Sequence, residues 1–218
     1  MKRIDTRPQS KHFQLSELKP GIFAAVCGQR GAGIGNAGMI DLGDRILIFD
    51  TFLTPQAAAD LLAMTLDLTG RRPDLVINSH YHNDHIWGNQ VFLPGALILS
   101  SAGTRDLITT SGQEEFDWYG AQSAARLGEL REQYEQVEDT AEKENIEPWL
   151  DYYGGLVKAF PDLKLCLPQM TFGDRFTIYG RDRRAELLTF ENGHTGSDTL
   201  LYLPDQDRNG IIFAADLM

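Results

Sequence analysis

The chain has 218 residues, which is enough for one domain with a hydrophobic core. It carries 20 basic and 31 acidic residues, a net charge of −11, and this deficit of basic residues argues against nucleic acid as its partner. The two cysteines, Cys27 and Cys166, predict no disulfide framework. The sequence has neither a signal-peptide pattern nor a long apolar run, so we expect a soluble, cytoplasmic protein that does not bind membranes.

The first fifty residues predict an antiparallel meander. We interpret residues 1–20 as a polar lead-in and expect strands over 21–27, 39–42 and 45–50. Between the first two strands, Gly31-Ala32-Gly33-Ile34-Gly35 loosely resembles a nucleotide-binding loop. Such a loop should open a helix, but a strand follows here, so a hairpin loop is the better interpretation.

A helix and two further strands follow the meander. Thr54-Pro55 is typical of a helix start and Gly70 of a helix end. Short apolar runs over 75–78 and 96–100 predict buried strands on either side of a polar segment. This order indicates an α/β arrangement, in which ligands collect at the carboxyl ends of the strands.

Residues 102–165 differ in character and predict a helical insertion. Apolar residues from Phe116 to Ala141 recur at helical spacing, which predicts an amphipathic helix of several turns. Residues 113–151 hold 12 acidic and 3 basic side chains. We interpret them as a solvated helix face, and the alternative is a lid or a partner surface. The aromatic run over 148–153 predicts a buried cluster or a pocket cap, and strands resume after Leu165.

Three of the five histidines fall within His80-Tyr81-His82-Asn83-Asp84-His85. In an extended backbone, residues two apart point the same way, so His80 and His82 can converge on one point. Asp84 and His85 follow where the chain should turn, and can reach a second point nearby. Imidazole and carboxylate donors suit zinc, with iron or manganese as alternatives. The competing interpretation is a histidine-rich surface loop.

Two more residues are candidate ligands because they also lie at predicted strand ends. His194 lies in a tight turn between two strands, and Asp216 follows the apolar run Ile211–Ala215. A cluster that already holds four donors makes both more plausible as ligands.

At these residues the chain resembles the metallo-β-lactamase-fold hydrolase superfamily. The match consists of His80-x-His82-x-Asp84-His85, Gly193-His194-Thr195, Phe213-Ala214-Ala215-Asp216-Leu217, and Phe49-Asp50-Thr51 upstream. The ligand set is similar to that of glyoxalase II-like thioesterases and lactonases. The resemblance implies an α/β (α+β) fold, a four-layer αββα sandwich of two mainly antiparallel sheets. We expect residues 1–218 to form one such domain, with the insertion at about 102–165 within it.

The resemblance also implies a role for each candidate. One zinc would be held by His80, His82 and His194. The second would be held by Asp84 and His85, with Asp216 bridging the two metals. Asp50 would orient the histidine loop through hydrogen bonds.

The family pattern ends with one more histidine, well after the Asp216 position. Here Met218 follows two residues later, and His12, which matches no family motif, is the one histidine left unassigned. We therefore expect a fragment that lacks the C-terminal part of the fold, with an unpaired sheet edge and an uncovered apolar face. The second metal site would be one ligand short, and metal analysis should give closer to one tight zinc than two.

The expected function is zinc-dependent hydrolysis of a small-molecule ester, thioester, lactone or related bond. A metal-bound hydroxide would attack the bond, and the catalytic residue Asp84 would orient it or relay a proton. One alternative is a silent or impaired metal-binding domain that acts through its acidic insertion. Others are a β-lactamase or phosphodiesterase on the same fold, or an iron-dependent redox enzyme. Asp216 stands where the best-known zinc β-lactamases have a cysteine ligand, which disfavours the β-lactamase alternative.

Overall fold

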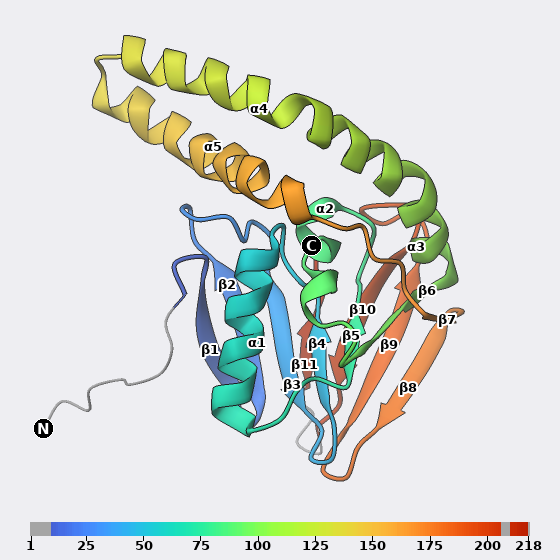
Figure 1. Ribbon diagram of the computed structural model, residues 1–218. Helices are drawn as coiled ribbons and strands as arrows, with labels where there is room; N and C mark the ends of the chain where they lie inside the picture. Colours follow the sequence, from blue (N-terminus) through green and yellow to red (C-terminus); the bar gives the residue numbers. More distant parts are fainter. Residues whose placement is uncertain (1–9, 206–209, 218) are drawn as a thin grey trace, which may run out of the picture.

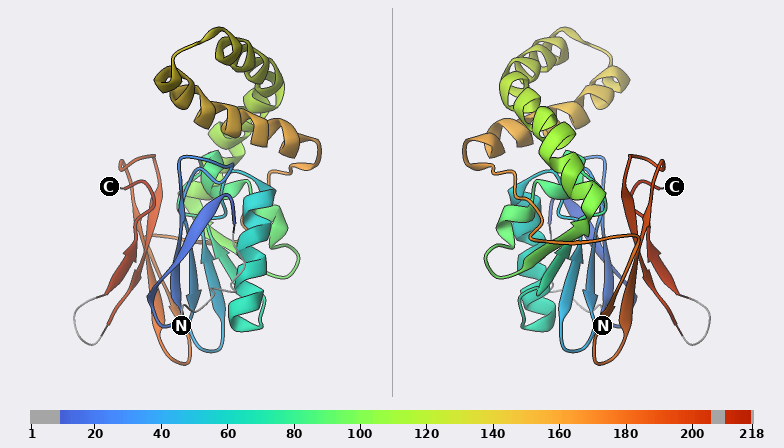
Figure 2. Two further views of the ribbon diagram at one scale, coloured as in Figure 1. Left: turned by 90° about the vertical axis from the view of Figure 1, so that its left-hand side faces the viewer. Right: turned by 90° about the vertical axis from the view of Figure 1, so that its right-hand side faces the viewer.

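Two β-sheets face each other in the computed structural model, which describes residues 10–205 and 210–217. Helix α1 covers the outer side of the first sheet, and a long helical hairpin projects from one end of the pair (Figures 1 and 2). The prediction of a mixed α/β fold is confirmed. Part of the predicted lead-in and Met218 lie outside the described residues.

The first sheet has seven strands in sequence order. They are β1 (Phe13–Lys19), β2 (Ile22–Cys27), β3 (Ala37–Asp41), β4 (Ile46–Phe49), β5 (Leu75–Ile77), β6 (Leu97–Ser101) and β7 (Met170–Phe172). Strands β1 to β4 pair antiparallel, as the predicted meander requires. Strands β4 to β7 pair parallel, so the carboxyl ends of β4 and β5 meet at one edge.

Strand β1 corrects the prediction of a polar lead-in up to residue 20. It pairs antiparallel with β2, and Phe13 is buried and stacks on Phe52 with ring centroids 4.8 Å apart. In this strand only Phe13 and Leu15 alternate as apolar residues, and both Leu15 and Leu18 remain partly or largely exposed. An edge strand with so little burial carries too weak a period-two pattern to be recognised.

Helix α1 (Pro55–Thr69) begins and ends where the sequence indicates. The Thr54 side chain accepts a hydrogen bond from Ala57 N, and Gly70 adopts φ 67°, a left-handed conformation that favours glycine. Its buried residues, among them Ala58 and Leu61, pack with Met39, Ile48 and other residues of the first sheet. This helix forms the outer layer on that side.

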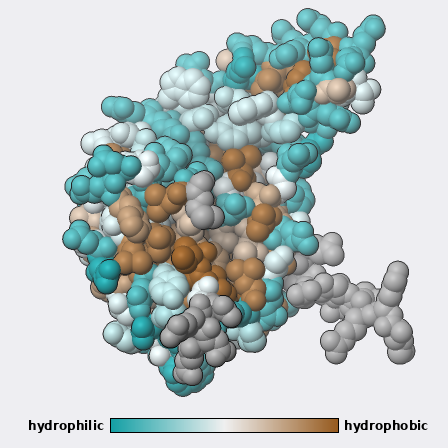
Figure 3. Space-filling view, turned by 180° about the vertical axis from the view of Figure 1, so that it is seen from behind, coloured by the Kyte–Doolittle hydropathy of each residue, from teal (hydrophilic) through white to brown (hydrophobic). Residues whose placement is uncertain are grey.

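The second sheet has four antiparallel strands in the order β11-β10-β9-β8. They are β8 (Arg175–Tyr179), β9 (Arg184–Phe190), β10 (Asp198–Leu203) and β11 (Ile211–Phe213). Leu187 and Leu201 are fully buried against the first sheet. On the opposite face Phe190 is 44% and Ile212 57% exposed, and hydrophobic side chains gather there (Figure 3). Among the described residues, no helix packs on this face.

The helical insertion between β6 and β7 consists of several elements. They are α3 (Ala102–Leu107), the π-helix η2 (Ile108–Gly112), α4 (Gln113–Gln136), α5 (Thr140–Ala159) and the 3₁₀ turn η3 (Phe160–Asp162). The prediction of a single amphipathic helix from Phe116 through Ala141 is wrong, because the structure has two helices over this range. The chain leaves helical geometry at Val137, with ψ 129°, and Asp139 caps a second helix by accepting from Glu142 N.

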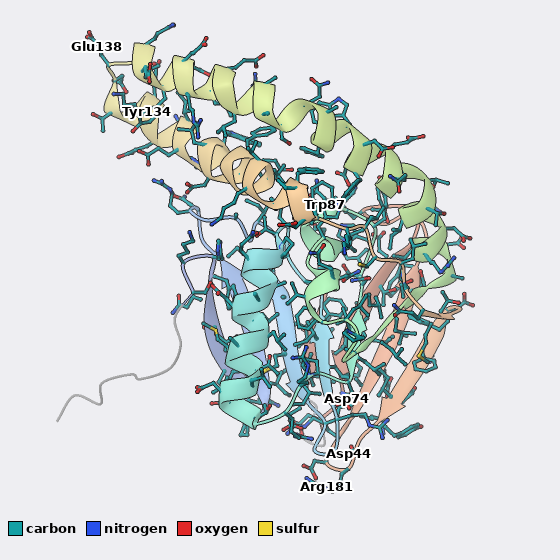
Figure 4. The ribbon with its side chains drawn as sticks, viewed as in Figure 1. Asp44, Asp74, Trp87, Tyr134, Glu138 and Arg181 are labelled. Carbon is teal, nitrogen blue, oxygen red and sulfur yellow. The ribbon has the colours of Figure 1, made fainter. Side chains whose placement is uncertain are left out.

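Helices α4 and α5 form a hairpin whose far end leaves the body of the protein. Trp87 lies where the hairpin meets the body, while Tyr134 and Glu138 lie at its far end (Figure 4). The predicted aromatic cluster is found in α5, where Tyr152 and Tyr153 are buried but Trp149 is 55% exposed. In the described part of the chain, no helix combines the length and apolar character needed to span a bilayer.

Candidate metal centre

The predicted ligands meet at one edge of the two sheets. Strand β5 ends at Ile77 and leads through Ser79 to His80. His82 immediately precedes the short helix α2 (Asn83–Ile86), which carries Asp84 and His85. His194 lies between β9 and β10, and Asp216 lies three residues after β11. The fold thus brings together segments that are far apart in sequence.

Three imidazole nitrogens converge as the first metal site requires. His80 Nε2 lies 3.1 Å from His82 Nδ1, and His194 Nε2 lies 3.0 Å from the same Nδ1. Nitrogens that bind one zinc at about 2.0–2.1 Å in tetrahedral geometry lie roughly 3.3 Å apart. The three side chains form a group whose donor atoms could hold one metal ion.

A second group of donors lies beside the first. His85 Nε2 is 3.4 Å from Asp216 Oδ1 and 3.5 Å from Asp84 Oδ2. The other Asp216 oxygen, Oδ2, lies 3.6 Å from His194 Nε2, so this carboxylate faces both groups. The mutually close donors of the second group belong to His80, His85 and Asp216. Asp84 approaches His85 without joining that set, so its role as ligand and catalytic residue stays a prediction.

Asp50 makes hydrogen bonds to the segment that carries the histidines. One carboxylate oxygen, Oδ1, accepts a hydrogen bond from Ser79 N at 2.8 Å. The other oxygen, Oδ2, is 2.8 Å from His85 Nδ1. Because Asp50 engages Nδ1, the Nε2 atom of His85 is turned toward the carboxylates. Asp50 is fully buried and adopts φ 61°, a backbone strain of the kind that persists at functional sites.

Ser79 is a supporting residue that the sequence analysis missed. Its hydroxyl donates to Asp50 Oδ2 at 2.7 Å and lies 2.9 Å from His80 Nδ1. The single hydroxyl proton goes to the carboxylate, so the oxygen accepts from His80 Nδ1 and leaves the Nε2 lone pair of His80 facing His82. A serine after a strand is too common for the sequence alone to reveal this role.

Burial and neighbouring charge set the protonation of the site. Burial, together with the neighbouring imidazoles, lowers the pKa of His80 to about 2, so its lone pair is available to a metal at neutral pH. Burial opposes protonation of His85, but the Asp50 and Asp216 carboxylates outweigh it and raise the pKa of His85 well above its ordinary value. The nearby His85 imidazole lowers the pKa of Asp216 to about 2.

The unpartnered Nε2 atom of His85 is a further observation that favours a metal ion at this site. His85 Nε2 is fully buried and makes no hydrogen bond among the described residues, although carboxylate oxygens of Asp216 and Asp84 lie 3.4 and 3.5 Å from it. A buried polar atom without a partner is costly. A cation between His85 and the carboxylates would remove that cost.

The helical insertion contacts the metal-binding turn through Asn83. Its amide Nδ2 donates to Glu115 Oε1 of α4 at 3.2 Å and to the Tyr152 hydroxyl of α5 at 3.4 Å. Burial, followed by the charge of Asp84, raises the pKa of Glu115 to about 7. Neither contact could be predicted from the sequence, because each joins residues more than 30 positions apart.

Comparisons with known proteins agree with this geometry. The family model of the metallo-beta-lactamase superfamily matches residues 30–161. A metallo-beta-lactamase from Pontibacter korlensis is similar in structure, with a TM-score of 0.60 and 14% identity over 93% of this chain and 70% of that one. One from Hirschia baltica has a TM-score of 0.57 and 14% identity over 94% of this chain and 71% of that one.

No curated protein matches the chain by sequence. The two structural similarities bear on the fold alone, because identity is low. The family match spans more than half of the chain and includes the histidine cluster His80–His85. The chain therefore belongs to the metallo-β-lactamase superfamily.

Proposed function

We propose that the protein is a metal-dependent hydrolase of a small-molecule ester, thioester, lactone or related bond, with zinc as its metal. The observation that carries the proposal is the convergence of three imidazole nitrogens beside a buried, unpartnered His85 Nε2 and two carboxylates. The superfamily consists mostly of metallo-hydrolases, which supports the same reaction class.

His80, His82 and His194 would hold one ion, and His85 with Asp216 and Asp84 a second. When bound, the metal supplies Lewis acidity and lowers the pKa of water to about 7. The chain itself supplies orientation. Asp50 and Ser79 fix the buried imidazoles of His80 and His85, so the Nε2 atom of each points in a single direction.

The exposure of the site indicates where a substrate would enter. His80 and His85 are each 1% exposed, whereas the side chains of His194 and Asp216 are 35% and 42% exposed. A substrate would therefore approach from the side of His194 and Asp216. Asp84, whose side chain is 21% exposed, is positioned to accept a proton during the reaction or to orient the nucleophile.

Turnover of a substrate panel tests the proposal. The panel contains p-nitrophenyl acetate, an acyl thioester, a γ-lactone, bis(p-nitrophenyl) phosphate and a chromogenic β-lactam, each assayed after chelation and after reloading with zinc, iron(II) or manganese. We expect zinc-restored cleavage of a carboxylic ester, thioester or lactone, lost in His82→Ala and retained in Asp67→Asn, a change of the exposed Asp67 on α1.

Other outcomes favour the alternatives. Zinc bound in stoichiometric amount with no turnover of any substrate favours the silent metal-binding domain. Cleavage confined to the phosphodiester or the β-lactam favours those activities. Oxygen consumption with iron alone favours a redox enzyme.

A further inference from the structure

A second pocket lies away from the metal centre, between the β2–β3 loop and α5. It encloses about 480 Å³, a volume in the range of small-molecule sites. Figure 1 shows the β2–β3 loop rising beneath α5, and the two make contact where a side chain added at Gly155 would lie 2.4 Å from the Ala32 Cβ. We name this cavity the basic pocket after the charges that line it.

The basic pocket is positively charged on a strongly acidic protein. Lys11, Arg30 and Lys158 line it against one carboxylate, that of Asp151, although the chain carries a net charge of −11. The Asp151 carboxylate is already engaged, since its Oδ2 accepts from Arg30 Nε at 2.7 Å and from Gly31 N at 3.1 Å. Arg30 also pairs with Glu147. The charge of Arg30 is therefore neutralised within the protein.

Unlike Arg30, the two lysines of the pocket are not neutralised by a carboxylate of the described residues. Neither Lys11 nor Lys158 has an ion-pair partner within 4.0 Å in the part of the chain that the structure describes. Both act electrostatically on the same group, the imidazole of His12, as do the carboxylates of Asp60 and Asp151, so both lysines lie on the His12 side of the pocket. The nearby carboxylate of Asp60 is hydrogen-bonded to Ser10 at 2.6 Å.

His12 supplies a directed donor between these lysines. It is 6% exposed and lines the basic pocket. Its Nδ1 accepts a hydrogen bond from Ala32 N at 3.0 Å, so the ring proton lies on Nε2. Burial lowers the pKa of His12, which keeps the ring neutral and Nε2 a donor. Nε2 has no hydrogen-bond partner among the described residues.

The remaining wall is small and apolar. Ala32, Leu150, Gly154 and Gly155 line it, and a side chain added at Gly154 would meet no atom within 4 Å of its Cβ. Two successive glycines inside α5 cost helix stability; here Gly155 allows the close approach of Ala32, and Gly154 leaves room beside the lysines. The apolar part of an organic anion could occupy this space, whereas an inorganic anion would leave it empty.

We propose that the basic pocket binds a small organic anion. Its phosphate or carboxylate group would be held by Lys11, Lys158 and the Nε2–H of His12, and its apolar part would lie against Leu150 and Gly154. Lysine ammonium groups and a neutral N–H donor suit an oxyanion of either kind. This inference is independent of the hydrolase proposal, because none of these residues belongs to the metal centre.

Titration of the zinc-loaded chain with phenyl phosphate, benzoate and inorganic phosphate tests the proposal. Calorimetry gives the Kd, and ¹⁵N resonances of the histidine rings report where the ligand binds. We expect phenyl phosphate or benzoate to bind with a millimolar or lower Kd, more tightly than inorganic phosphate, and to shift the His12 Nε2 resonance. Preference for one organic probe identifies the group, phosphate or carboxylate.

Variants separate this pocket from other anion sites. Gly154→Met should weaken binding at least tenfold by filling the pocket, and it favours the helix. Lys11→Gln combined with Lys158→Gln should have a similar effect. Lys143→Gln combined with Lys164→Gln removes the same charge elsewhere and should change the Kd by less than twofold. Unchanged binding in Gly154→Met, or no saturable binding of any probe at 10 mM (about 2.7 kcal/mol of affinity), would overturn the proposal.

Discussion

The substitution Asp50→Asn tests how the metal centre is oriented. Asp50 accepts three hydrogen bonds, from Ser79 N at 2.8 Å, Ser79 Oγ at 2.7 Å and His85 Nδ1 at 2.8 Å. Asparagine keeps one acceptor oxygen. If that oxygen accepts from Ser79 N, the new NH₂ group faces His85 Nδ1, and the imidazole must move its proton to Nε2 to accept. The lone pair that faces the metal position is then lost.

The magnitude follows from these contacts. Loss of one hydrogen bond to a charged group costs about 1.5–3 kcal/mol, which lowers the Tm of a protein of this size by about 3–12 °C. Changing a residue that orients a metal ligand typically weakens metal affinity about 10–100-fold. We expect both effects in Asp50→Asn, because Asp50 is fully buried and also holds His80 through Ser79.

Two measurements check this prediction. Competition with a fluorescent zinc chelator gives the metal affinity, and calorimetry of the metal-free chain gives the Tm. Asp67→Asn, on the exposed side of α1, is the matched control and should leave both unchanged. If Asp50→Asn binds zinc within twofold of the wild-type value, the orienting role is refuted, even where the Tm falls.

Three further predictions address the surroundings of the site. Gly35→Ala should lower zinc affinity, because the new Cβ would lie 2.5 Å from Asp84 O and 3.0 Å from its Oδ2. The control Gly28→Ala, with no atom within 4 Å of its Cβ, should leave zinc affinity unchanged. Equal zinc affinities of the two variants in the chelator competition would contradict this prediction. Glu115→Gln should raise the Tm of the metal-free chain at pH 8 but not at pH 4.5. The pKa of Glu115 rises on folding from 4.5 to about 7, so the stability of the wild type falls as the pH rises from 4.5 to 7. The fall is about 1–2 kcal/mol after allowance for solvent screening. A Tm difference between Glu115→Gln and the wild type that does not change with pH would count against this prediction. When the free zinc concentration is 100 times the Kd, removing the zinc with a chelator should lower the free energy of unfolding by about 2.7 kcal/mol and the Tm by roughly 5–11 °C. A Tm unaffected by chelator in scanning calorimetry would argue against a bound metal.

Local patterns predicted most of the fold. The limits of α1 follow from Thr54 and Gly70, whose capping roles depend only on neighbouring residues. Strand β1 escaped prediction because pairing with β2, rather than its own alternation, holds it in place. The break at Val137 escaped because the apolar spacing continues from α4 into α5.

The candidate site also contains residues that the sequence indicated and residues that only the structure reveals. His80 and His82 could be paired from their spacing, but their approach to His194 depends on the connection between β9 and β10, 112 residues away from His82. Ser79 and Glu115 gave no signal, since their roles arise from contacts that the fold creates. Sequence motifs reveal donors, whereas the residues that orient donors are revealed by geometry.

Zinc-edge anomalous diffraction from zinc-loaded crystals tests the central claim most directly. We predict an anomalous peak about 2.0–2.1 Å from His80 Nε2, His82 Nδ1 and His194 Nε2. A peak at another place, or no peak between these three nitrogens at full zinc loading, would contradict it.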